Sequence, residues 1–256
     1  MALFTSLEHL HIEILDLLAF ATLFFAYYLY QPVTDFVLGD DISARMKPWR
    51  LAWARQLQWR EERITDVSLV RGLVSGVSFF ASTSVLIISG LVALLSVAGP
   101  ISEAMQAYPM FQETTTEQIA FKVVSLLLLA VVAFFKFGWS MRLHAYSTLM
   151  IGAMPPPHES GSAEANAISE RLAEMSFLAS KHFHGGMRAY YLGFGALTWF
   201  LSTLLFFVTL ALVLAVMIRR DYMSKAFRLA QSPSSLETLL TNSSNKPTEG
   251  VSKVCK

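Results

Sequence analysis

The chain has 256 residues, of which 54% are hydrophobic and only 15% are charged, well below the roughly 25% of ordinary soluble domains. A soluble protein of this length could not hide so much apolar surface in one core, whereas a lipid bilayer removes that requirement. The formal net charge of +1 gives no strong overall field, so we expect no nucleic-acid partner. A single cysteine, Cys255, excludes a disulfide framework.

Four apolar stretches are long enough to cross a membrane, which takes about 20 helical residues. They run over about 12–30, 74–97, 119–139 and 190–218. The first follows a segment without Lys or Arg, so we interpret it as a retained helix rather than a cleaved signal. The sequence therefore predicts an all-α fold: one membrane-spanning helical bundle of four spans over 1–230 with long cytoplasmic helical extensions. A flexible tail rich in Ser, Thr and Asn is expected over 231–256.

The segment 42–73, between the first two spans, alternates basic, aromatic and apolar residues. Arg45, Trp49 and Trp53 follow one another at intervals of four, which places them on one helical face. We expect a helix that lies at, or rises from, the membrane interface and can continue unbroken into the second span. That span is rich in Gly, Ser and Thr, which permit close helix contact in lipid. This contact could lie within a subunit or between subunits. We expect a homo-oligomer, because a chain with four spans offers little room for a pore of its own.

Basic residues close to membrane spans mark the cytoplasmic side. The segment after the first span contains Arg45, Lys47, Arg50, Arg55, Arg60, Arg63 and Arg71. The segment after the second span contains none before Gln118, and basic residues return after the third. This asymmetry predicts a periplasmic N-terminus. Four crossings would place the C-terminus on the periplasmic side as well, although four further basic residues close to the last span favour the opposite side: Arg219, Arg220, Lys225 and Arg228.

Three long stretches carry a family resemblance. They are REERITDVSLVRGLVSGVSFFASTSVLIISGL at 60–91, AFFKFGWSMRLHAYSTLMIGAMP at 133–155 and KHFHGGMRAYYLGF at 181–194. Together they resemble the bacterial domain-of-unknown-function 599 family of integral membrane proteins, over about residues 10–228. The resemblance implies a multi-pass protein of the bacterial inner (plasma) membrane, and it transfers no catalytic residue.

The segment before the first span offers one candidate metal site. His9, Glu13 and Asp16 lie four and three residues apart, so on a helix they share one stripe. An imidazole and two carboxylates could bind a divalent cation or collect protons at the outer mouth of a pathway. The alternative is the amphipathic start of a helix, where acidic residues favour the positive end of the helix dipole.

Charged and hydroxyl-bearing residues gather on the predicted inner side. Lys136 stands among aromatic residues near the end of the third span, where it could attract anions or simply extend to the interface. The candidate pore or charge network consists of Ser78, Ser82, Lys136, Glu62, Arg63, Asp66, Arg142, His144, His182 and Arg188. Rings of charge can select ions at a pore mouth. Salt bridges between helices are the alternative.

These patterns leave three functional hypotheses. The first is an oligomeric ion channel or small-ion transporter, with the second span lining the path. The second is a non-catalytic accessory or scaffold subunit of a membrane complex with other membrane subunits. The third is a membrane redox protein or other enzyme, which is less favoured because common catalytic motifs are missing from the sequence. We expect no cofactor, since a haem would need facing histidines and only His144 with His182 or His184 could supply them.

Overall fold

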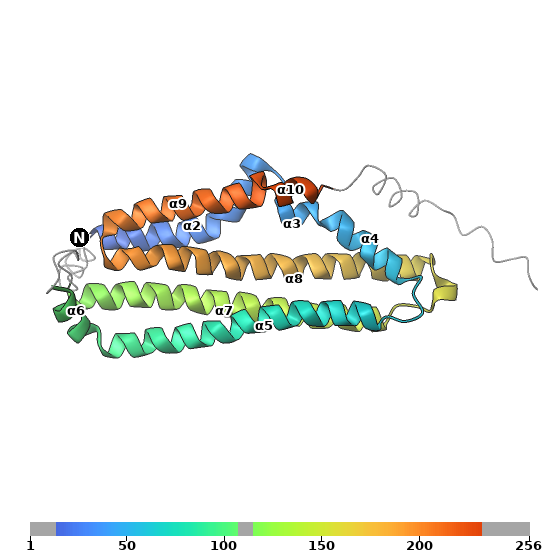
Figure 1. Cartoon of the computed structure of the whole chain (residues 1–256), viewed down its shortest axis with the longest axis horizontal. Helices are drawn as coiled ribbons and strands as arrows, with labels where there is room; N and C mark the ends of the chain where they lie inside the picture. Colours follow the sequence, from blue (N-terminus) through green and yellow to red (C-terminus); the bar gives the residue numbers. More distant parts are fainter. Residues whose placement is uncertain (1–13, 107–114, 232–256) are drawn as a thin grey trace, which may run out of the picture. The chain divides into compact units, whose positions relative to one another are not determined.

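The computed structural model describes residues 14–106 and 115–231, and these residues are helical wherever they form regular structure. The long helices are α2 (Ile14–Leu38), α5 (Ile64–Ser96), α7 (Thr116–Gly152), α8 (Ala163–Ala196) and α9 (Thr203–Met223) (Figure 1). The shorter elements are α3 (Ile42–Arg45), α4 (Lys47–Leu57), α6 (Ala98–Gln106), α10 (Lys225–Leu229) and the 3-10 turns η1 (Pro157–Glu159) and η2 (Leu197–Phe200).

Four of these stretches are long and apolar enough to cross a membrane. They are Ile14–Leu38, Ile64–Ser96, Thr116–Gly152 and Thr203–Leu229. The all-α class and the four apolar helices predicted from the sequence are thereby confirmed. The first helix continues through Pro32 and ends before Gly39, whose positive φ of 80° is a left-handed conformation that glycine adopts without strain.

The expected continuous helix from the interfacial segment into the second span is interrupted. Helix α4 ends at Leu57 and α5 begins at Ile64. Two arginines hold the intervening turn. Arg63 donates hydrogen bonds to the carbonyl oxygens of Met154 and Pro155, and Arg60 pairs with Asp66 of α5 at 2.5 Å. The charged sequence between α4 and α5 is thus anchored by one local ion pair and by hydrogen bonds to backbone groups distant in sequence.

The predicted fourth span, 190–218, is also not one helix. Helix α8 ends at Ala196, η2 follows, and α9 starts at Thr203. The stretch between the two helices contains neither Pro nor Gly, so no local breaker announces the turn. The turn residue Trp199 is wholly buried, which shows that tertiary contacts hold the break in place.

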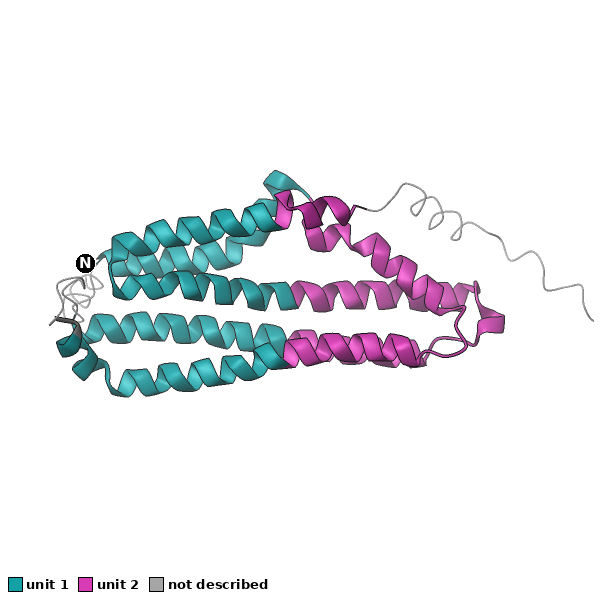
Figure 2. Cartoon of the chain, in the orientation of Figure 1, with its two compact units in different colours: residues 1–39, 79–138, 183–220 teal, residues 40–78, 139–182, 221–256 magenta. Residues whose placement is uncertain are grey.

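The chain divides into two compact units (Figure 2). Unit 1 contains the described residues within 1–39, 79–138 and 183–220, and unit 2 contains those within 40–78, 139–182 and 221–256. Helices α5, α7 and α8 are each divided between the two units, with one part in unit 1 and the other in unit 2. The core of unit 2 is aliphatic, and Ala54, Leu57, Ile151 and Leu172 are among its buried residues.

Unit 1 is built around aromatic rings. Phe80 of α5, Phe137 of α7 and Tyr190 of α8 pack with ring centroids 5.4 to 6.1 Å apart. The α8 backbone approaches α7 closely here, because a Cβ atom at Gly186 would stand 2.5 Å from the Phe137 ring. Glycine at this position is therefore a packing requirement of the α7–α8 contact.

Candidate functional site: a buried ion pair and the polar residues around it

A charged pair lies inside the apolar unit 1. Asp16, in the first turn of α2, and Lys122, near the start of α7, are only 2% and 3% exposed. The Asp16 Oδ1 and Lys122 Nζ atoms are 3.7 Å apart. Burying two charges costs several kcal/mol each unless they are paired and hydrogen-bonded, so the remaining partners of this pair decide what it can do.

Residues at the α8–α9 turn complete the network. Trp199 Nε1 donates a hydrogen bond of 2.8 Å to Asp16 Oδ1, and Thr203 Oγ1 donates one of 3.3 Å to the same oxygen. Lys122 Nζ donates to the Trp199 carbonyl oxygen at 3.2 Å. The Trp199 ring also packs against Phe206 of α9. The network thus fastens the turn and the start of α9 to α2 and α7.

The cation that lies beside Asp16 in the structure is the ammonium group of Lys122. His9 and Glu13, the other two members of the predicted metal site, lie outside the described residues. Among residues 14–106 and 115–231, no group of three His, Cys, Asp or Glu side chains is placed to hold a metal ion.

A second polar cluster in unit 1 centres on Arg188 of α8. Its guanidinium donates a hydrogen bond of 2.5 Å to Gln31 Oε1 of α2 and lies 4.6 Å from the Tyr30 ring centroid. Gln31 in turn donates to Asp35 Oδ1 at 2.8 Å. The Lys136 side chain, from α7, also lies against α8, because a Cβ atom at Gly185 of α8 would lie 3.5 Å from Lys136 Cδ. These two predicted network residues therefore join helices together.

The two candidate pore serines have different surroundings. Ser78 is half-buried, and its hydroxyl donates to the Val74 carbonyl at 2.8 Å and lies 3.6 Å from the Met141 sulfur. Ser82 is exposed on the face of α5 that points away from the rest of the chain's core. A path lined by Ser82 would therefore have to form between copies of the protein.

A groove of about 230 Å3 lies in unit 1 where α5, α7 and α8 meet. Its walls are almost entirely apolar and include Leu91, Leu129, Gly193 and Leu197. Such a lining offers no ligand for an ion. Tyr190 also lines the groove, and its hydroxyl is engaged with that of Ser84 in a hydrogen bond of 2.8 Å.

The acidic and basic members of the predicted network that fall in unit 2 differ in burial and in their contacts. Asp66 is buried and accepts hydrogen bonds from Trp53 Nε1 at 2.9 Å and from Arg60. Glu62 and Arg142 are exposed, and the Arg142 guanidinium is 5.9 Å from the Trp139 ring centroid. Arg60 precedes α5 and Asp66 lies in its first turn, so this ion pair is local to the start of one helix.

His144 and His182, the two histidines of the predicted network, occupy helix contacts in unit 2. His144 is buried on α7. Arg50 of α4 lies near enough to influence it electrostatically and donates to the carbonyl and hydroxyl oxygens of Ser176 at 3.3 and 2.7 Å. Burial lowers the pKa of Arg50, because the interior disfavours its charged form. The ring of His182 packs edge-on against Trp139, with centroids 6.2 Å apart.

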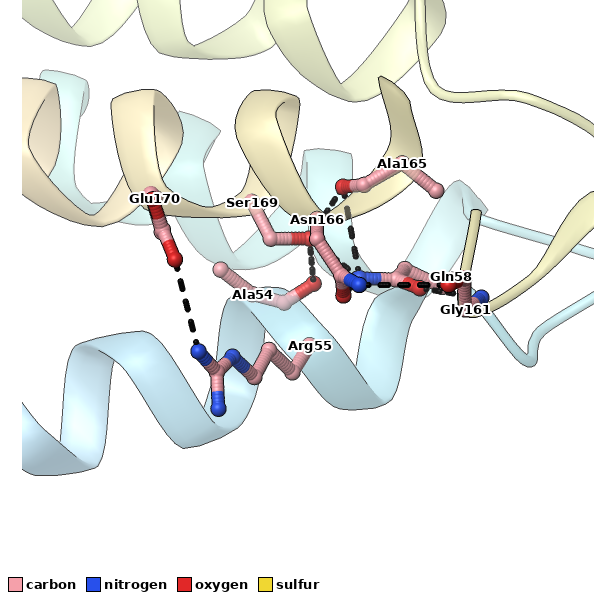
Figure 3. Close-up of polar contacts among 8 residues, drawn as sticks. All are labelled: Ala54, Arg55, Gln58, Gly161, Ala165, Asn166, Ser169 and Glu170. Carbon is pink, nitrogen blue, oxygen red and sulfur yellow. Dashed lines mark hydrogen bonds and ion pairs between the residues drawn. The ribbon is translucent and has the colours of Figure 1, made fainter. Parts of the chain in front are cut away.

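Helix α4, predicted to lie at the membrane interface, is docked onto α8 (Figure 3). Gln58, just past the end of α4, is buried. Its amide nitrogen donates to Ala165 O, Asn166 Oδ1 and Ser169 Oγ, and its oxygen accepts from Gly161 N at 2.9 Å. Figure 3 also shows Arg55 reaching Glu170 on the same face. The basic side chains of α4 therefore serve contacts within unit 2.

Comparison with known families adds an identification. The family model described as "Protein of unknown function, DUF599" matches residues 17–226. The chain belongs to this family. No curated protein and no solved structure matches it. The DUF599 match confirms the resemblance seen in the sequence and covers parts of both units.

The DUF599 match includes Lys122, Trp199 and Thr203, and it begins one residue after Asp16. Sequence reasoning singled out Asp16 but assigned it to a metal site, and it missed the other three. One signal was available: each of the first and third spans begins with a charged residue of opposite sign. Trp199 and Thr203 carried no such signal, because the turn that presents them was not recognised.

Proposed function

We propose that this DUF599 protein is a non-catalytic membrane subunit that acts through helix association, beginning with self-association along the outward face of α5. The observation that carries this proposal is a heptad pattern on that face. Gly76, Thr83 and Gly90 recur at intervals of seven, and Phe79 and Leu86 alternate with them. Phe79 and Leu86 are 66% and 73% exposed.

This alternation suits contact with a second helix. A repeat of seven residues is the pattern by which two helices in parallel orientation pack knobs into holes. In lipid, small residues at the seam let two backbones approach closely. A Cβ atom at Gly76 or Gly90 would meet nothing within 4 Å in a single chain. The large side chains of one copy could therefore fill the space above the small residues of the other.

The occupant we propose is a second α5 because three charged side chains of unit 1, Asp16, Lys122 and Arg188, already have partners within the chain. Asp16 is bonded to Lys122 and Trp199, and Arg188 to Gln31. What unit 1 offers to a neighbour on the α5 side is shape rather than charge. We place this assembly in the bacterial inner membrane, where other membrane subunits could join the same face.

The test is dimerisation in a bilayer. We would label the protein with donor and acceptor dyes, reconstitute it in lipid vesicles and measure energy transfer while diluting it with lipid. Gly90→Leu should shift the dilution curve by at least tenfold toward the monomer. Ala215→Leu is the matched control, because Ala215 is an exposed small residue on α9. A curve for Gly90→Leu that overlays the wild-type curve would refute self-association through α5.

An ion-conducting assembly is the second candidate, and one observation favours it. Ser75, Ser82 and Ser89 follow one another at intervals of seven beside the seam, and all three are exposed. In an assembly of several copies they could line a central path for small ions. Phe79 and Leu86 count against a wet path, because large apolar side chains at a constriction expel water.

Current recordings separate the two candidates. Purified protein in a planar bilayer under a salt gradient should stay silent if α5 forms only dry contacts. Discrete conductance that changes when Ser82 is replaced by Phe would favour the ion path. Conductance unaffected by that replacement would exclude α5 as the lining helix.

A further inference from the structure

The second half of α8 runs alongside α7 in the opposite direction. Lys122 near the start of α7 bonds to Trp199 of η2, the turn that follows α8. Further along, Leu129 lies against Gly193, and Phe137 against Gly186. Steps of seven and eight residues along α7 are matched by steps of six and seven residues back along the facing segment. The matched stretch of α7 is about 22 Å long at 1.5 Å per residue, which is most of a hydrocarbon layer of roughly 30 Å.

Helix α9 then runs back along α8. The hydroxyls of Thr198 and Thr209 hydrogen-bond at 2.6 Å next to the turn. At the far end of the pair, the Arg220 guanidinium lies 4.8 Å from the Tyr191 ring centroid. The two helices therefore form an antiparallel hairpin whose turn is fastened by Trp199.

The remaining helices of unit 1 also contact α8. Helix α2 is antiparallel to it, since Asp16 meets Trp199 at one end and Arg188 meets Gln31 at the other. Helix α5 is parallel to it, since Ser84 meets Tyr190 and Leu91 lines the same groove as Leu197. Thus α2, α7 and α9 point one way, and α5 and α8 point the other.

We infer that residues 183–200 form a fifth membrane crossing. Composition alone does not identify it, because this stretch carries His184 and Arg188 and several glycines. A helix contacted by four others has little need of an apolar surface, and a charged residue at membrane depth is tolerated where it faces the bundle and is paired. Arg188 satisfies that condition through Gln31. Five crossings put the two ends of the chain on opposite sides.

Contacts within unit 2 support the same topology independently. Trp49 Nε1 of α4 donates to the Ala230 carbonyl at 3.0 Å, and the Arg45 guanidinium lies 3.8 Å from the Phe227 ring centroid of α10. The segments that follow α2 and α9 therefore lie on the same side of the membrane. This differs from the four-crossing expectation, in which the C-terminus shares the side of the N-terminus.

The fifth crossing also removes the conflict in the charge distribution. The basic residues at the end of α9 and in α10 join the seven of the segment after α2 on one side. These residues are Arg219, Arg220, Lys225 and Arg228. The segment from Gly99 to Gln118, on the other side, has no Lys or Arg. The positive-inside rule then assigns the N-terminus to the periplasm and the C-terminus to the cytoplasm.

Cysteine accessibility tests this inference in the full chain. Cys255 is the only cysteine, so Cys255→Ser provides a background for single reporters at three exposed positions: Glu103→Cys on α6, Glu159→Cys on η1 and Lys225→Cys on α10. A membrane-impermeant maleimide is applied to intact cells and to permeabilised cells. We expect labelling of Glu103→Cys in intact cells, and labelling of the other two only after permeabilisation.

The Lys225 and Glu103 reporters decide the number of crossings. Opposite accessibility at these two positions supports five crossings, whichever side is cytoplasmic. Equal accessibility, with Glu159 alone on the other side, would restore four crossings and overturn the inference. Retention of the wild-type thermal unfolding midpoint by each purified variant in detergent shows that a changed pattern does not come from misfolding.

Discussion

The two units bury polar groups in different ways. Unit 1 places a full ion pair, Asp16 with Lys122, among apolar helices and closes it with the indole of Trp199. Unit 2 also buries a carboxylate, Asp66, but pairs it with an Arg60 side chain that is 40% exposed. Its other buried side chains are tied to backbone groups at chain breaks, as Gln58 and Arg63 are. In lipid the backbone has no water to bond with, so it stays helical and side chains make the cross-links. The comparison predicts larger penalties for polar losses in unit 1.

The largest effect should come from Asp16→Ala. This change leaves the Lys122 ammonium buried without its carboxylate, and breaking a buried pair in this way costs about 3–5 kcal/mol. The thermal unfolding midpoint of the purified protein in detergent should fall further than it does for Gly186→Ala or Ser84→Ala. Asp16→Ala combined with Lys122→Met should recover part of the loss, because the lone charge is gone.

The matched control for this pair is in unit 2. Arg55 and Glu170 are 3.4 Å apart, but the Glu170 side chain is 57% exposed. Glu170→Ala should cost about 0–1 kcal/mol, as surface pairs do. Equal losses of stability for Asp16→Ala and Glu170→Ala would mean that the buried pair of unit 1 contributes no more than the exposed pair of unit 2.

Packing provides the second contrast. A Cβ atom at Gly186 would meet the buried Phe137 ring at 2.5 Å, whereas one at Gly193 would meet Leu129 at an ordinary 3.7 Å. Gly186→Ala should destabilise unit 1 by about 1–3 kcal/mol through overpacking, and Gly193→Ala should have little effect. The measurement is again the unfolding midpoint. An unchanged unfolding midpoint for Gly186→Ala would show that the Phe137 ring can move aside, so that the α7–α8 contact is less tightly packed than the 2.5 Å distance indicates.

The third prediction concerns the docking of α4. Gln58→Ala removes the buried amide that bonds to Gly161 N and Ser169 Oγ, and hydrogen bonds of this kind contribute about 0.5–1.5 kcal/mol each. Limited proteolysis between α4 and α5 should accelerate, because the loss is local to this junction. Gln56→Ala is the control, since Gln56 is the same residue type on the exposed side of α4. Similar cleavage rates in both variants would contradict the docking role.

Hydropathy predicted the class and most of the apolar helices because length and composition alone decide whether a helix can cross lipid. It did not find the α8–α9 turn, because no Pro or Gly marks residues 197–202 and the turn depends on Trp199 meeting Asp16. It also assigned α4 to the membrane interface, since a basic and aromatic face is typical of such helices. The interfacial position stays a prediction. Several of those side chains bind α8 and α10, and contacts between segments so distant in sequence leave no local pattern.

Hydrogen bonds between membrane helices should give the smallest effect. Ser84 and Tyr190 bond to each other at 2.8 Å, but the Tyr190 hydroxyl also donates to the Phe80 carbonyl at 3.0 Å. Ser84→Ala therefore leaves Tyr190 with a partner and should cost about 0.6 kcal/mol, the average for such bonds in membranes. Ser89→Ala, whose hydroxyl bonds to its own helix, should cost less in the same unfolding assay. A loss of stability for Ser84→Ala as large as that for Asp16→Ala would mean that unit 1 depends on its neutral hydrogen bonds as much as on its buried charges. The two units would then differ in how deeply their polar groups are buried, not in whether those groups are charged.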